Sequence, residues 1–244
     1  MTMTSTEQSI LRAGYCRREE LGCADTEAMR GLLGAHFEGV EDLQFADDLR
    51  EKSHVLRVWK GDELVGFSTL LACRCEIEDE VFNLLYSGDT IMSPACWGSP
   101  VLARGWIAMV LDLQRTMPPG RCLWLLLSAG FRTYRFLPVF WREFWPRFDV
   151  VTPESVRVLR DEIAAGRFGD AFDRQAGVVR FPRPHRLRGA LAEVPDSRRQ
   201  DPHVSFFLEA NPGWREGDEL VCLTEIDSSN LTHAGRRMVR QTSR

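Results

Sequence analysis

LWLLLSAGFRTYRFLPVFWREFWP, residues 123–146, is the stretch of the chain that decides its fold. It begins as a fully apolar run, breaks at Ser128-Ala129-Gly130, and resumes as an aromatic segment. The aromatic segment repeats at the three- and four-residue steps of one helix face, at Leu137, Phe140, Trp141, Phe144 and Trp145. Pro138 is tolerated if that helix begins near residue 137, because proline is harmless in a first turn. We therefore predict a buried strand followed by a short helix, a core unit of an α/β domain.

Composition narrows the class of protein. Hydrophobic residues make up 44% of 244, which is enough for a substantial core, and the net charge of −4 gives no global field toward nucleic acid or membrane. Seven cysteines without a secretory signal indicate reduced thiols, and Cys73-x-Cys75 is too close for the usual metal-binding spacing. No apolar run approaches the ~20 residues that span a bilayer. We expect a soluble cytoplasmic protein with no metal site.

The chain up to residue 149 contains clear periodic segments. Residues 1–26 are polar, and we predict that they form a flexible N-terminal arm. The predicted elements that follow are helices at 27–37 and 41–51, strands at 54–59, 64–73 and 81–91, and a helix at 101–115. Gly88 is a candidate bulge site in the third of these strands. Without a bulge, Tyr86 and Asp89 would lie on opposite faces of that strand.

Beyond residue 149 the pattern changes. Thr152-Pro153-Glu154 is a helix start, and the helix is predicted to end at Gly166. Residues 167–200 are irregular and basic, with a run of arginines between 180 and 188. Residues 203–209 and 219–226 have the pattern of a hairpin, and a short helix is predicted from about residue 229.

This order of elements resembles the GNAT superfamily of acyl-CoA N-acyltransferases. TIMSP at 90–94 and ACWGSPV at 95–101 are similar to that family's central strand, donor-binding loop and following helix start. FWREFW at 140–145 is similar to the aromatic helix after the family's fifth strand. The resemblance covers about 27–149 and 203–226, and it leaves about 150–202 as an insertion. It implies a single α/β (α+β) domain over 27–244, with a mixed, mostly antiparallel central sheet flanked by helices.

The resemblance also implies a donor site. An acyl-CoA or another acyl thioester would bind the strand end, the loop and the first helical turn, at Ile91, Met92, Ser93, Cys96, Trp97, Gly98, Ser99 and Arg104. The family's loop reads Arg/Gln-x-x-Gly-x-Gly/Ala, whereas this chain keeps Gly98 and has Pro100 at the next glycine position. Proline lacks an N–H donor, and Arg104 is one turn further along to compensate. Members with weakened loops take acyl groups from an acyl carrier protein or an aminoacyl-tRNA.

Two residues are candidates for acid–base chemistry on this scaffold. Asp89 lies late in the central strand, where a carboxylate could deprotonate an amine, and the alternative is a turn or bulge residue. Tyr134 lies close to where the family places the acid for the departing thiol, and the alternative is a packing residue. Trp141 aligns with the family's more usual acid position and cannot donate a proton in that role. Cys96 is a candidate nucleophile or, alternatively, a small buried thiol.

Three functional hypotheses remain open at this point. The first is an acyltransferase that moves an acyl group from a CoA or acyl carrier protein thioester to a small-molecule amine. The second is a non-catalytic member of the same fold that binds a ligand or a partner. The third is an aminoacyl-tRNA-dependent transferase that uses the basic segments at 180–188 and 236–244. The surplus of Trp and Phe leaves room for a homodimer interface, and no membrane partner is expected.

Overall fold

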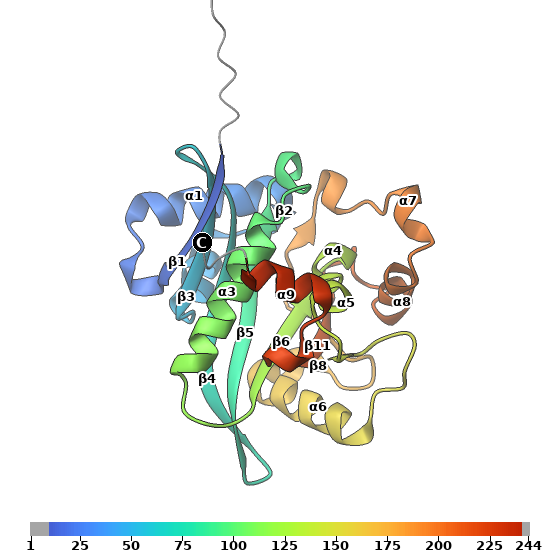
Figure 1. Cartoon of the computed structure of the whole chain (residues 1–244). Helices are drawn as coiled ribbons and strands as arrows, with labels where there is room; N and C mark the ends of the chain where they lie inside the picture. Colours follow the sequence, from blue (N-terminus) through green and yellow to red (C-terminus); the bar gives the residue numbers. More distant parts are fainter. Residues whose placement is uncertain (1–9, 241–244) are drawn as a thin grey trace, which may run out of the picture.

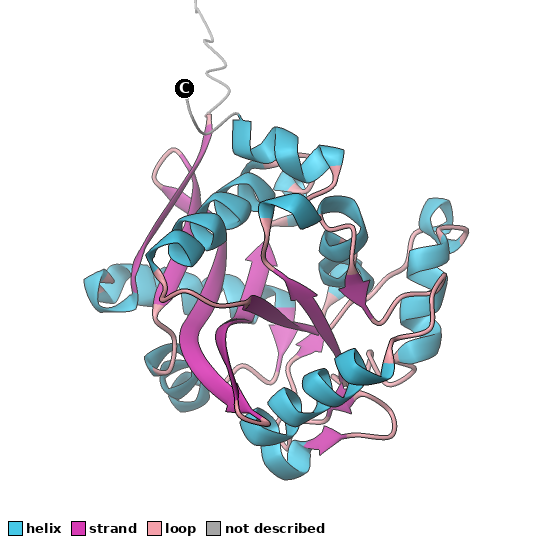
Figure 2. Cartoon of the chain, turned by 60° about the horizontal axis from the view of Figure 1, so that its bottom comes forward, coloured by secondary structure: helices cyan, strands magenta, loops and turns pink. Residues whose placement is uncertain are grey.

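The computed structural model describes residues 10–240. Their central element is a mixed β-sheet that is flanked by helices (Figures 1 and 2). Its strand order is β1-β3-β4-β5-β6-β11-β9-β8, and β7 pairs beside β11. The strands are β1 (Leu11–Arg17), β3 (His54–Lys60), β4 (Glu63–Ile77), β5 (Glu80–Met92), β6 (Cys122–Ser128), β7 (Phe144–Trp145), β8 (Phe172–Asp173), β9 (Val178–Val179) and β11 (Glu219–Glu225). All of their pairings are antiparallel except that of β5 with β6. A separate two-stranded sheet pairs β2 (Phe37–Glu38) with β10 (Arg186–Leu187).

Helices cover both faces of the sheet. They are α1 (Cys23–His36), α2 (Asp42–Arg50), α3 (Val101–Thr116), α4 (Phe131–Tyr134), α5 (Phe136–Phe140), α6 (Glu154–Phe168), α7 (Asp196–Arg199), α8 (Pro202–Ala210) and α9 (His233–Arg240). Figure 1 shows α3 and α9 together over one face of the sheet. Core clusters on the opposite face include side chains of α1, α2 and α6. The predicted mixed, mostly antiparallel sheet flanked by helices is confirmed.

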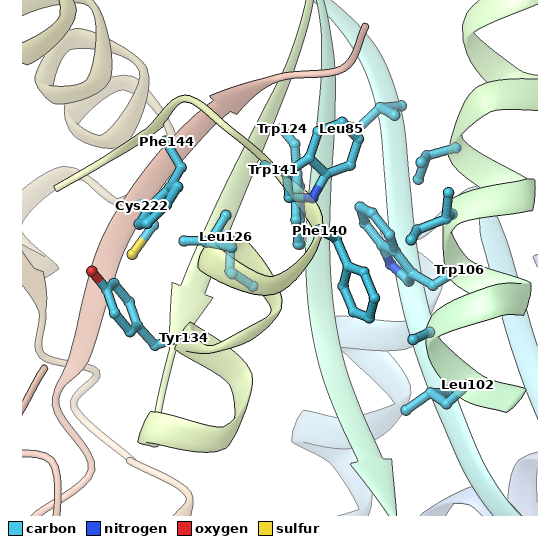
Figure 3. Close-up of a cluster of buried hydrophobic side chains, with 14 of the residues drawn as sticks. Leu85, Leu102, Trp106, Trp124, Leu126, Tyr134, Phe140, Trp141, Phe144 and Cys222 are labelled. Carbon is cyan, nitrogen blue, oxygen red and sulfur yellow. The ribbon is translucent and has the colours of Figure 1, made fainter. Parts of the chain in front are cut away.

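The strand predicted from the opening stretch is β6, and every residue in it is buried. Its alternate side chains enter two different cores, because successive residues of a strand point to opposite faces. Trp124 packs with Trp106 of α3, with ring centroids 4.0 Å apart (Figure 3), whereas Leu123 and Leu125 pack with the α6 cluster. A strand covered on both faces needs a continuous apolar run, which is what this stretch provides.

The aromatic helix lies earlier in the chain than predicted. Helices α4 and α5 occupy residues 131–140, Trp141 has extended backbone angles, and Phe144–Trp145 forms β7 along β11. Asn230 explains the end of the helix, because its Nδ2 donates to the carbonyl of Glu143 (3.1 Å) and its Oδ1 accepts from the Glu143 N–H (2.8 Å). Phe140, Trp141 and Phe144 are buried and Trp145 is half-buried, but these hydrogen bonds favour an extended segment.

The predicted N-terminal arm is wrong for residues 11–26. Residues 11–17 form β1, which pairs antiparallel with β3 along its whole length, and α1 begins at Cys23. An edge strand that is half exposed carries little hydrophobic patterning, so its backbone pairing was not predictable from composition. Residues 1–9, the rest of the predicted arm, lie outside the described part of the chain.

The predicted closing hairpin is wrong in its first half, because residues 203–209 lie in the helix α8. The carboxylate of Asp201 accepts from the His203 N–H (3.1 Å), and Pro202 occupies the first helical position. The second half is confirmed as β11. The predicted insertion also contributes α6, α7 and three short strands, of which β8 and β9 extend the central sheet. Helix α6 continues to Phe168, past the predicted end at Gly166.

Within residues 10–240, no helix combines the length and apolar character needed to cross a bilayer. Over the same range, no group of three or more His, Cys, Asp or Glu side chains is placed to hold a metal ion.

Replacing Asn230 tests the account of the displaced aromatic helix. Asn230 Nδ2 also donates to the carbonyl of Glu225 (2.9 Å), so Asn230→Asp removes these donors and turns a carboxylate toward carbonyl oxygens. We expect a loss of about 1–3 kcal/mol in the free energy of unfolding, measured by urea denaturation. Ser228→Ala, at a nearby exposed position, serves as the control and should unfold like the wild type. Wild-type stability in Asn230→Asp would contradict the account.

Candidate functional site

Strands β5 and β6 separate partway along their length. Their parallel pairing runs from Asn83 opposite Cys122 to Ser87 opposite Leu126, whereas β5 continues to Met92. The side of residues 88–92 that faces β6 therefore lacks a strand partner. A cleft with a volume of about 1050 Å³ opens at this point, and residues of both strands line it.

A β-bulge lies where the two strands separate. In the β4–β5 pairing, Ser68 is opposite Thr90 and Leu70 is opposite Ser87, so both Gly88 and Asp89 face the single residue Thr69. The extra residue changes which face the following side chains occupy. As a result, Tyr86 and Asp89 both line the cleft. The candidate bulge at Gly88 is confirmed, and it brings the predicted carboxylate into the cleft.

His185 is the partner of Asp89, and the two form an ion pair when the imidazole is protonated. Its Nδ1 lies 3.9 Å from Asp89 Oδ1, a distance typical of an ion pair rather than a hydrogen bond. The segment that carries His185 is held in place because the next two residues pair as β10 with β2. Burial alone would lower the pKa of His185, but the nearby carboxylates of Asp89, Glu219 and Asp48 outweigh it, so the pKa is raised.

Two further carboxylates face the same part of the cleft. Glu219 is the first residue of β11, and Asp48 comes from α2. Burial, with the charge of Asp89, raises the pKa of Glu219 to about 7 and also raises the pKa of Asp48. Three carboxylates and one histidine therefore gather from four separate elements. We call Asp48, Asp89, His185 and Glu219 the acidic cluster.

Lys52 and Arg167 approach the ring of Tyr86 in this half of the cleft. Lys52 Nζ lies 5.2 Å from the ring centroid, and the Arg167 guanidinium carbon lies 5.1 Å from it. Arg167 forms an ion pair with Glu51. Lys52 is only 7% exposed, and burial lowers its pKa. Burial also raises the pKa of the Tyr86 hydroxyl.

The opposite half of the cleft contains the N-terminus of α3. The Arg104 N–H donates to the Pro100 carbonyl (2.8 Å), whereas the N–H groups of Leu102 and Ala103 have no acceptor among residues 10–240. Both of these residues line the cleft. Unpaired N–H groups at a helix start favour an anion, since the helix dipole acts in the same direction.

Two arginines add positive charge near this helix start. The Arg132 guanidinium stacks over the Trp97 ring at 4.2 Å and donates to the carbonyls of Leu191 and Glu193. Burial and the charge of Arg198 lower the pKa of Arg132. Arg198 of α7 also lines the cleft, and within the described chain its side chain makes no ion pair. This half of the cleft is therefore electropositive.

The predicted donor-site residues divide into two groups. Those that line the cleft are Ile91, Met92, Trp97, Gly98 and Ser99, and those that do not are Ser93, Cys96 and Arg104. The Ser93 N–H donates a hydrogen bond to the Val65 carbonyl, and Cys96 is buried in the core beside α3. Trp97 Nε1 donates to the Met92 carbonyl (2.8 Å), so the indole covers the end of β5.

Tyr134 does not line the cleft. It is fully buried, its hydroxyl donates to the Pro146 carbonyl (3.0 Å), and burial raises its pKa. Figure 3 shows its ring directed toward Cys222 of β11, away from the Trp106 side of the core. This placement matches the packing alternative rather than the predicted acid. Trp141, at the family's more usual acid position, is also buried in the core.

Sequence reasoning missed most of the acidic cluster. Asp48, His185 and Glu219 are far apart in sequence, and only the folded sheet brings them next to Asp89. One signal was present for Glu219, because GDELV at 217–221 repeats the pentamer at 61–65. Both copies form a turn followed by a strand, but only the second directs its glutamate to the cleft.

Similar solved structures carry acyltransferase descriptions. A probable N-acyltransferase from Enterococcus faecalis is 12% identical, with a TM-score of 0.42, over 64% of this chain and 44% of that one. YhbS from Escherichia coli is a GNAT-family N-acetyltransferase solved with CoA. It is 18% identical, with a TM-score of 0.39, over 52% of this chain and 68% of that one. A GCN5-related N-acetyltransferase from Kribbella flavida is 11% identical, with a TM-score of 0.41, over 93% of this chain and 68% of that one.

No family model and no curated protein matches the sequence. The chain spans less than half the length of the Enterococcus faecalis protein. At these identities, and with TM-scores below 0.5, these likenesses transfer no fold, activity or ligand to this chain. The GNAT-type fold predicted from the sequence rests on the chain's own strand order, with one parallel pair that separates beside the α3 helix start.

The pKa of Glu219 predicts a measurable effect of pH on stability. Between about pH 4.5 and 7 the folded chain keeps a proton that unfolded Glu219 has released, so stability falls as pH rises through this window. Glu219→Gln removes this loss, and we expect it to gain about 2–4 kcal/mol relative to wild type between pH 4.5 and 7.5. Urea unfolding at both values measures the difference. The control Glu209→Gln, at an exposed site on α8, should follow the wild type. A pH-independent offset would contradict the buried-carboxylate account.

Proposed function

We propose that this chain is an N-acyltransferase that moves an acyl group from acyl-CoA to a small-molecule amine. The observation that carries the proposal is the separation of β5 from β6, which lies between an anion-favouring helix start and the acidic cluster. A thioester donor needs both a phosphate site and an extended slot, and an amine acceptor needs a base beside them. The phosphate site, the slot beside β5 and the candidate base all lie in the same cleft.

The donor half supports a CoA-like molecule. The diphosphate would accept from the free N–H groups of Leu102 and Ala103, with Arg132 and Arg198 supplying charge. The pantetheine arm would run along the side of β5 that lacks a strand partner and use its backbone groups. A Cβ placed on Gly98 would meet nothing within 4 Å, so the loop leaves open space there despite Pro100.

The acceptor half supports a cationic amine. Asp48, Asp89 and Glu219 attract a protonated amine, and Asp89 with His185 can remove its proton to give the nucleophile. The amine nitrogen then attacks the thioester carbonyl, the C–S bond breaks, and the CoA thiolate leaves. A cysteine thiol has a pKa of about 8.5, and CoA also carries an alkyl thiol, so its thiolate is a competent leaving group without Tyr134 as an acid.

The basic segment at 180–188 gives little support to the tRNA alternative. Arg180 pairs with Asp173 and Asp218, Arg183 with Glu41, and Arg188 with Glu38. Arg186 donates to the Glu216 carbonyl. These guanidinium groups therefore meet the chain's own carboxylates and carbonyls, which leaves less charge for a phosphate backbone or an acidic carrier protein. We accordingly favour a free acyl-CoA as donor.

Gly98→Val tests the donor site. The side chain would project into open space at the cleft, so we expect wild-type stability but at least about a tenfold loss of acetyl-CoA affinity, or 1.4 kcal/mol. Isothermal titration calorimetry measures the affinity, and the melting temperature without ligand reports the fold. Gly31→Val is the matched control, because Gly31 is also free of neighbours but lies on α1. Unchanged affinity in Gly98→Val would place the donor elsewhere.

Asp89→Asn tests the base. Removing the carboxylate at the bulge should lower kcat for amine acetylation by about 10²–10⁴-fold, while acetyl-CoA affinity stays near that of wild type. Thiol release measures the turnover. Asp62→Asn, in the exposed turn between β3 and β4, is the control and should retain full activity. Wild-type turnover in Asp89→Asn would remove Asp89 from the mechanism.

A further inference from the structure

The chain almost never uses lysine. Of its 31 lysine and arginine residues, 29 are arginines, and the two lysines are Lys52 and Lys60. Arginine stays protonated in proteins, whereas a lysine can lose its proton and act as a nucleophile. Lys60 is exposed at the end of β3, whereas Lys52 is buried and lines the cleft. One of the two lysine side chains in this chain therefore lies inside its candidate active site.

The side chain of Lys52 lies against the backbone where β5 leaves β6. A Cβ placed on Gly88 would be 2.5 Å from Lys52 Cε and 3.4 Å from Lys52 Nζ. Gly88 directly follows Ser87, the last β5 residue paired with β6. The glycine is thus needed for Lys52 to approach this closely. The amine lies beside the first stretch of β5 that a donor could occupy.

In the described part of the chain the Lys52 amine contacts the ring of Tyr86, at 5.2 Å from the centroid, rather than a carboxylate or a carbonyl. Across residues 10–240 its Nζ makes no hydrogen bond and no ion pair within 4 Å, although the residue is buried. The charged groups that act on it are Asp89, Asp48, Glu51 and Arg167. Burial outweighs the carboxylates and lowers the pKa of Lys52, which increases the share of the neutral, nucleophilic form.

We propose that Lys52 is itself an acyl acceptor, so that the protein acylates its own cleft when no amine substrate is bound. This inference rests on the proposed function, because it requires an acyl thioester in the slot between β5 and β6. The neutral Nζ attacks the thioester carbonyl and forms an amide, and the C–S bond breaks. Asp89 accepts the proton lost by Nζ, and the CoA thiolate leaves and takes a proton from solvent.

Acylation of Lys52 would change the site in two ways. It removes a positive charge that interacts with Asp48 and Asp89, and it places an acyl group in the acceptor half of the cleft. The acyl group would occupy space that an amine substrate needs, so the modified chain would turn over amine substrates more slowly. Because an amide does not hydrolyse readily, this loss of activity would persist. Self-acylation would thus reduce activity when the donor is abundant and the acceptor is scarce.

The test is incubation of the full-length protein with acetyl-CoA and no amine, followed by peptide mass spectrometry. Lys60 is an internal reference for uncatalysed acetylation, since it is exposed to the same solution. We expect Lys52 to be acetylated about 10²-fold faster than Lys60, because the cleft holds both reactants together. The rate per molecule should not depend on protein concentration. Lys52→Arg should abolish the fast reaction, and Lys60→Arg should retain it.

A parallel assay with a small diamine separates this inference from the proposed function. If the diamine is acetylated but Lys52 reacts no faster than Lys60, the self-acylation proposal is wrong and the transferase proposal stands. If acetyl-CoA does not bind and neither the diamine nor Lys52 is acetylated, both proposals fail. Fast acetylation of Lys52 in wild type, with slower diamine turnover by the pre-acetylated protein, supports the inference.

Discussion

The separation of β5 from β6 is the structural feature on which the rest of the site depends. Parallel pairing stops at Ser87 and Leu126, and the bulge at Gly88 and Asp89 follows at once. Without this separation the backbone of residues 88–92 would hydrogen-bond to β6, and no slot would exist for an extended ligand. The bulge also turns Asp89 toward the same half of the cleft as Tyr86.

The two halves of the cleft have opposite electrostatic character. The helix start of α3, with Arg132 and Arg198, favours an anion, whereas the acidic cluster favours a cation. A molecule with phosphates at one end and a reacting carbonyl at the other would bridge them. Lys52 and Arg167 are cationic residues in the acidic half, and Lys52 differs from Arg167 because it is a buried amine that can lose its proton. Its position distinguishes this cleft from a simple carboxylate pocket.

Much of the fold could be predicted from the sequence, because β3, β5 and α3 each carry a clear period. The predictions were wrong where a few hydrogen bonds outweighed the pattern. Asn230 favours an extended segment after α5, and the Asp201 cap favours a helix over residues predicted as a strand. Asp89 was predicted, but its partners were not, since the long-range pairing of β10 with β2 places His185.

A crystal structure with an unreactive acetyl-CoA analogue tests the central claim most directly. The account predicts that the pantetheine arm lies between β5 and β6 beyond Ser87 and Leu126, with the diphosphate at the start of α3. The acyl carbonyl should lie next to Gly88, between Lys52 and Asp89. An analogue bound outside the cleft, or with its acyl group away from the bulge, would contradict the account.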